Sequence, residues 1–322
     1  MQKILYGIHP QEYEHPLDRE ALNILQKISG IEALYQKFQG STIEKAVLLS
    51  YKGEKLKINS KNFEKIYALY MKACEILDFD NPPDLYTSWD YNLDAHAFGV
   101  EKPSIFISSG TIDILNDDEL MFIFGHELAH IKSGHMFYYN LARRFLPLII
   151  NNIPIPNVPV LGKVVVESIQ YPLYHWSRMQ ELTCDRAGLL CCQNEISSYR
   201  VLIALAGVPL KYQKDNYVQE FIEQSRQFIE DDFEPTDKII KKFSQAYSFD
   251  RYLNAGELIP QTHPFPMLRI GKLKEWIESG NYEKILKKER TKIEILYCQK
   301  CNEIINKGDK FCGACGAEIK ID

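Results

Sequence analysis

The stretch DDELMFIFGHELAH spans residues 117–130 and predicts the central helix of the chain. Its acidic start stands where the cap and the dipole of a helix favour negative charge, and no proline interrupts it. Residues four apart lie on one face of a helix, so His126 and His130 present two imidazoles to one metal ion. Glu127 points about a quarter-turn away, where a carboxylate reaches a water on the metal without binding the metal itself.

A second motif, QELTCDRAG, follows at residues 180–188 and predicts another helix with an acidic face. Glu181 and Asp185 are four apart and therefore share that face. Glu181 can supply a third metal ligand, and Asp185 can orient a ligand histidine and fix its tautomer. HExxH alone is a short motif with a false-positive risk, and the two motifs together are much more specific.

The two motifs together resemble a family of gluzincin metallopeptidases, which includes HtpX, the mitochondrial Oma-type proteases and the CAAX prenyl endopeptidases. The resemblance extends over roughly Lys61 to Ser279. It implies zinc-dependent peptide hydrolysis. It also implies roles for five residues, with His126, His130 and Glu181 as zinc ligands, Glu127 as the general base, and Asp185 behind the ligands.

Two further segments resemble elements of that family. Thr262-His263-Pro264 with Arg269 is similar to its His-Pro…Arg element, which implies that His263 contacts substrate or the developing oxyanion and that Arg269 stands behind the site. Residues 92–99 resemble its Asn-Ala-Phe segment, although His96 occupies the place of an asparagine in many relatives.

Residues 83–109 predict a small sheet, with short β-rich runs at 84–88, 95–99 and 104–108. In the family an edge strand near this segment pairs with extended peptide. The resemblance therefore implies a substrate strand that includes Ala97, Phe98 and Ile105. The alternative interpretation is a sheet that only supports the central helix.

One other zinc class is excluded by spacing. The metzincin pattern needs a glycine three residues after the second histidine and a third histidine three further on. Here Gly134 and His135 fall at offsets four and five from His130. His135 is therefore expected to pack or to lie behind the ligands rather than to bind the metal.

The other patterned segments are expected to have a structural role only. Apolar residues recur at helical spacing over 17–38 and 63–77, and residues 46–58 suggest a short hairpin. We expect a mainly helical α+β fold with a small sheet. Its parts are an N-terminal region (1–60) packed on the catalytic domain, the catalytic domain (61–280), a charged linker (281–296) and a zinc ribbon (297–322).

The ribbon is predicted from two CxxC pairs, Cys298 with Cys301 and Cys312 with Cys315. Each pair offers two thiolates to one tetrahedral, structural zinc ion. Residues 296–322 hold four lysines and four acidic residues, so no basic surface for nucleic acid is present. We therefore prefer the interpretation that the ribbon binds a protein partner.

Composition indicates the surroundings of the protein. The net charge of −5 over 322 residues favours neither nucleic acid nor anionic membranes. No secretory signal is visible, and the other four cysteines lie in helix-like runs, which indicates a reducing, cytoplasmic location. Residues 145–162 are uncharged, but four prolines interrupt them. We therefore expect no membrane contact at this segment, and a peripheral contact is the alternative.

These patterns favour a zinc metalloendopeptidase with one catalytic and one structural zinc ion, acting on protein or peptide substrates. The alternative is a catalytically silent relative that only binds partners. That alternative predicts damage to the zinc-ligand set, and none is visible in the sequence.

Overall fold

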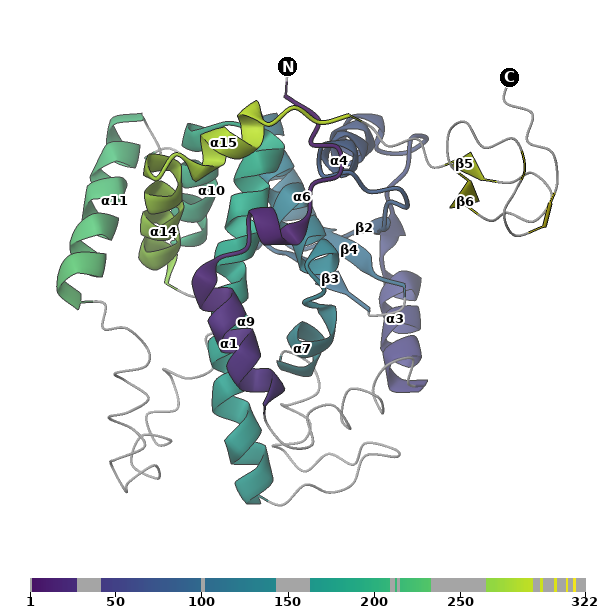
Figure 1. Cartoon of the computed structure of the whole chain (residues 1–322), viewed down its shortest axis with the longest axis horizontal. Coiled ribbons are helices and arrows are strands. Elements are labelled where there is room, and N and C mark those ends of the chain that lie inside the picture. The colour runs from purple at the N-terminus through teal and green to yellow at the C-terminus, as the bar shows by residue number, and fades with distance from the viewer. Residues whose placement is uncertain are drawn as a thin grey trace.

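The computed structural model describes residues 2–27, 42–99, 102–142, 163–208, 212, 215–232, 265–291, 296–297, 304–305, 311 and 315–316. Two helices cross at its centre, α6 (Asp117–Lys132) and α9 (Lys163–Cys192), as Figure 1 shows. The sheet and α4 (Glu64–Ile76) lie on one side of this pair, and α10 (Glu195–Leu205) lies on the other. The fold is mainly helical with a small sheet, as predicted.

Helix α6 is the predicted central helix, with a better-defined start. Asn116 is its N-cap: the Asn116 side chain accepts from the Glu119 backbone N–H, and the Glu119 carboxylate accepts from the Asn116 N–H. This capping box satisfies two of the amides that a helix start leaves unpaired. The helix is buried from Glu119 to His130, so it forms the middle of the core rather than a surface face.

The sheet contains four strands in the order β1-β2-β4-β3. The strands are β1 (Leu56–Lys57), β2 (Asp84–Ser88), β4 (Ser104–Ser108) and β3 (Ala95–Phe98), and β2 and β4 are parallel while the other pairs are antiparallel. One face packs into the main core with α6. The other face carries Tyr86, Phe98 and Phe106.

The expected hairpin over 46–58 is wrong. Residues Thr42–Glu54 form helix α3, and only Leu56–Lys57 form a strand. Leu48 and Tyr51, three apart on α3, pack on the aromatic face of the sheet, and the Tyr51 ring meets that of Phe106 edge-on at 5.2 Å. Helical spacing lets both side chains reach one surface.

The strands also correct one expected substrate residue. Ile105 lies in β4, which is paired with β2 on one side and with β3 on the other. Its backbone therefore has no free edge for an added strand. Ala97 and Phe98 lie in β3, which is the last strand of the sheet on that side among the described residues.

Glycines bring α6 and α9 into close contact. A Cβ atom on Gly125 would stand 2.4 Å from the Cβ of Cys191, and one on Gly188 would stand 2.9 Å from the Phe122 carbonyl oxygen. Cβ atoms in folded proteins essentially never approach other atoms this closely, so a side chain at either position would force the two helices apart. Gly125 directly precedes His126, and the crossing therefore places that histidine against α9.

We expect Gly125→Ala to destabilise the protein by about 1–3 kcal/mol, the usual cost of overpacking a core. The added methyl must push α9 away from α6. Gly53→Ala is the matched control, because Gly53 is helical with no heavy atom within 4 Å of the new methyl, and alanine favours a helix. Urea unfolding measures both, and equal midpoints for the two variants would contradict the close crossing.

The other elements enclose this centre. The N-terminal region contributes the short 3-10 turn η1 (Pro10–Glu12) and α1 (Pro16–Gln26), and α1 lies along α9 (Figure 1). The chain also forms α5 (Ser109–Ile114), α7 (Met136–Asn140), α11 (Asp215–Gln227), the π-helical turn η4 (Phe228–Asp232) and α14 (Pro266–Glu278).

The expected linker begins as part of the core. Residues Asn281–Lys287 form α15, whose Tyr282 and Ile285 are buried with the main cluster. Glu283, Lys284 and Lys287 are exposed on this helix, whereas Lys288 and Arg290 follow it and pair with Glu12. Further on, β5 (Leu296–Tyr297) and β6 (Ile304–Ile305) form an antiparallel pair.

Several expectations fall outside the described residues. These are Cys298, Cys301, Cys312, His263, the uncharged run 145–162 and the end of the helix expected over 17–38. Within the described part of the chain, no helix combines the length and the apolar character that crossing a bilayer requires.

Candidate metal centre

The crossing of α6 and α9 brings the two sequence motifs together. Nε2 of His126 lies 3.4 Å from one carboxylate oxygen of Glu181, and Nε2 of His130 lies 3.7 Å from the other. Glu181 has no exposed surface, and the two histidines are 5% and 1% exposed. The three donor groups from the two helices thus converge in the interior of the protein.

A chain of charged contacts stands behind them. Nδ1 of His126 lies 3.1 Å from Oδ1 of Asp185. Arg269 donates from Nε and Nη2 to the two oxygens of that carboxylate, at 2.8 and 2.5 Å. Arg269 comes from α14, so the predicted residues 185 and 269 meet across two helices. Because the carboxylate only accepts, Nδ1 carries a proton and Nε2 faces Glu181.

The electrostatics of this cluster favour an added cation. Burial raises the pKa of Asp185, but Arg269 and His126 outweigh burial and leave that pKa below its usual value. Burial likewise lowers the pKa of His126, and the Asp185 and Glu181 carboxylates outweigh it and raise the pKa to about 9. Two buried carboxylates therefore hold a positive charge at His126, which a proton or a metal ion can supply.

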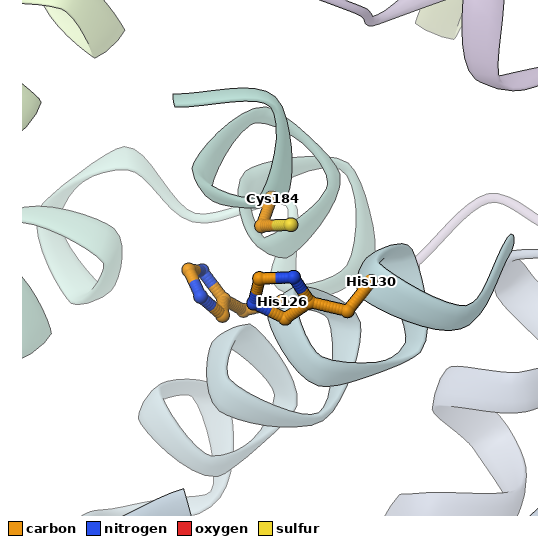
Figure 2. Close-up of side chains that lie close together, drawn as sticks. All are labelled: His126, His130 and Cys184. Carbon is orange, nitrogen blue, oxygen red and sulfur yellow. The ribbon is translucent and has the colours of Figure 1, made fainter. Parts of the chain in front are cut away.

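A cysteine also lies within reach of the histidines. Ligand atoms of His126, His130 and Cys184 all lie within 4.8 Å of one another, and Figure 2 shows the thiol on α9 above the two rings on α6. Burial, with the charges of Glu181 and Asp18, raises the pKa of this thiol well above 9. In the absence of a metal, Cys184 is therefore a neutral thiol.

Two side chains thus compete for the third ligand position. Ligand bonds of 2.0–2.2 Å around a tetrahedral zinc ion separate two N or O donors by about 3.4 Å. The Glu181 separations of 3.4 and 3.7 Å, each measured to a different carboxylate oxygen, are close to this value, and the ligand atoms of His126, His130 and Cys184 all lie within 4.8 Å of one another. The Glu181 carboxylate contacts both imidazoles, and both side chains are close enough to supply the third ligand. The donor types, their burial and their spacing all fit a zinc ion.

Residues from the N-terminal region complete the surroundings, and no pattern in the sequence indicated them. Asp18 of α1 is fully buried and accepts from the Thr183 hydroxyl at 2.6 Å. Nε2 of His135 lies 3.3 Å from the same carboxylate oxygen, and Nδ1 of His135 lies 3.8 Å from the sulfur of Cys184. His135 thus lies behind the site, as its spacing from His130 predicted.

Glu127, the predicted general base, is also buried, at 4% exposure. It follows His126 on α6, and His126 and His130 face α9. The arrangement of two helical histidines, a neighbouring glutamate and a carboxylate from a crossing helix is that of a metallopeptidase.

Comparison with known proteins gives the family. Residues 60–277 match the family model described as peptidase family M48. Because this match covers more than half of the chain, the chain belongs to peptidase family M48.

One similar protein is the plastoglobule-localized metallopeptidase 48, chloroplastic, of Arabidopsis thaliana. It is 28% identical over 283 residues, which cover 87% of this chain and 76% of that protein. No solved structure matches the chain. Helix α1 and its Asp18 lie before the residues that the family model matches.

Proposed function

We propose that this protein is a zinc-dependent endopeptidase. The observation that carries the proposal is the position of the Glu181 carboxylate, 3.4 and 3.7 Å from Nε2 of the two HExxH histidines. His126, His130 and Glu181 would hold the zinc ion. A zinc ion bound there lowers the pKa of a coordinated water and polarises the peptide carbonyl.

The chain's own residues do the remaining work. Glu127 takes a proton from the attacking water and passes it to the leaving amine nitrogen. Asp185 holds Nδ1 of His126, which keeps the Nε2 lone pair directed into the site. Arg269 keeps the Asp185 carboxylate ionised and oriented. His263 is proposed to stabilise the oxyanion.

Substrate binding is proposed along β3. Its outer edge, at Ala97 and Phe98, can pair with the backbone of an extended peptide, which gives affinity with little sequence preference. Such a mode suits unfolded or flexible segments of proteins.

The ribbon is proposed to hold a second, structural zinc ion through Cys298, Cys301, Cys312 and Cys315, and to recruit a protein partner. In sequence, the short antiparallel pair β5–β6 flanks the first two of these cysteines, which supports a zinc ribbon. A cytoplasmic location is also proposed, since the buried Cys74, Cys184, Cys191 and Cys192 are free thiols.

Metal exchange tests the proposal. Dialysis against a chelator should abolish cleavage of an unfolded protein such as casein, and zinc should restore it, whereas magnesium should not, because it prefers oxygen ligands. Mass spectrometry of the fragments should find cuts within the chain rather than only at its ends. Undiminished cleavage by the stripped protein would rule out a zinc-dependent reaction.

A further inference from the structure

The Cys184 thiol and the side chains behind it form a buried row that the proposed mechanism does not use. It runs from the Asp18 carboxylate through the His135 ring to the sulfur of Cys184, with separations of 3.3 and 3.8 Å. Asp18, His135 and Cys184 are 0%, 3% and 0% exposed. Beyond the sulfur lie the two histidines of α6 (Figure 2).

The contacts of this row fix where the ring proton of His135 lies. A carboxylate oxygen only accepts, so Nε2 of His135 carries the proton that faces Asp18. Nδ1 of the neutral ring then bears a lone pair, which faces the sulfur of Cys184. The thiol is therefore next to a proton acceptor, and that acceptor is itself backed by a buried carboxylate.

We propose that Cys184 is a further metal ligand, which occupies the fourth position of the centre in the resting protein. This inference rests on the proposed zinc site. The metal centre would then have four protein ligands, of which His126, His130 and Glu181 remain bound during the reaction. Thiolate is among the preferred ligands of zinc, and a site with four protein ligands has no open position for water.

Ligation needs a modest movement and a balanced proton transfer. Zn–N and Zn–S bonds of about 2.0 and 2.3 Å place nitrogen and sulfur about 3.5 Å apart, and the ligand atoms of the three side chains lie within 4.8 Å of one another, so a small approach suffices. The S–H bond breaks as the metal–sulfur bond forms, and the proton passes to Nδ1 of His135. The resulting imidazolium faces the carboxylate of Asp18. Hydrolysis then requires the thiolate to leave and recover its proton.

Cobalt(II) provides the test, because a cobalt–thiolate bond absorbs in the near ultraviolet and a cobalt–imidazole bond does not. The full-length protein is stripped of metal and loaded with cobalt beside Cys184→Ala and Cys191→Ala. Cys191 is the matched control, since it is also buried on α9 and alanine keeps the Cβ that faces Gly125. The proposed ribbon contributes equally to all three spectra and cancels in the differences.

At equal cobalt content, Cys184→Ala should lose part of the thiolate absorption, and Cys191→Ala should not. Peptide cleavage by Cys184→Ala should be at least as fast as that by the wild type, because no thiolate has to leave the metal. Superimposable spectra for all three proteins would overturn the inference. If Cys184→Ala does not fold, Cys184→Ser keeps the side-chain shape and gives the same readout. Since the spectrum does not depend on cleavage, a protein that shows the band but hydrolyses nothing would refute the proposed function and leave this ligand in place.

Discussion

Glu127→Gln should lower peptide hydrolysis by about 10²- to 10⁴-fold, the usual contribution of a positioned acid–base group. The amide has the same shape but cannot take a proton from water. The metal ligands are untouched, so the zinc content should equal that of the wild type. The measurement is the initial rate of casein cleavage, together with the zinc content of the same sample.

Asp117→Asn is the control for this change. It replaces another carboxylate on α6 by its amide, but Asp117 is half-exposed and paired with Lys65 at 2.7 Å, so the rate should stay close to that of the wild type. Cleavage by Glu127→Gln at the wild-type rate would remove Glu127 from the mechanism. It would also favour the alternative of a catalytically silent relative, with the cleavage coming from a contaminating protease.

Glu181→Ala should abolish detectable cleavage and weaken zinc binding by more than the roughly 10–100-fold that changes behind the ligands cause. The substitution removes the carboxylate that lies between the two histidines. Any remaining affinity would come from His126, His130 and Cys184. Competition with a chelator of known affinity measures the loss.

Two companions sharpen this experiment. Glu181→Gln keeps one oxygen donor without the charge and should fall between the wild type and Glu181→Ala. Glu181→Ala combined with Cys184→Ala leaves two imidazoles and should bind zinc still more weakly than the single variant. A Glu181→Ala protein with wild-type zinc affinity would exclude this carboxylate from the ligand set.

The sequence was most informative where spacing alone determines a face. His126 and His130, like Glu181 and Asp185, are four apart, and helices at both places bring them together. The strands at 84–88 and 104–108 were also predicted at their observed bounds, and the strand at 95–99 ends one residue earlier, at Phe98. In each case the local periodicity of the sequence agrees with the helix or strand that packs there.

The failures have physical causes as well. The run AVLLSY favours strand or helix equally by composition, and the aromatic face of the sheet decides for α3. Nothing in the local sequence indicates that Gly125 lies at a close helix crossing. The contact between Asp18 and His135 joins residues that are distant in sequence, and only the packing of α1 on α9 creates it. Cys184 could have been noticed, because it stands three residues after Glu181 on the same helix.

The most direct test of the metal centre is anomalous diffraction at the zinc absorption edge from crystals of the full-length protein. We expect a peak at the crossing of α6 and α9, about 2.0–2.2 Å from Nε2 of His126, Nε2 of His130 and a carboxylate oxygen of Glu181. The absence of zinc from this crossing, or a bound zinc ion with the Glu181 carboxylate beyond bonding distance, would contradict it.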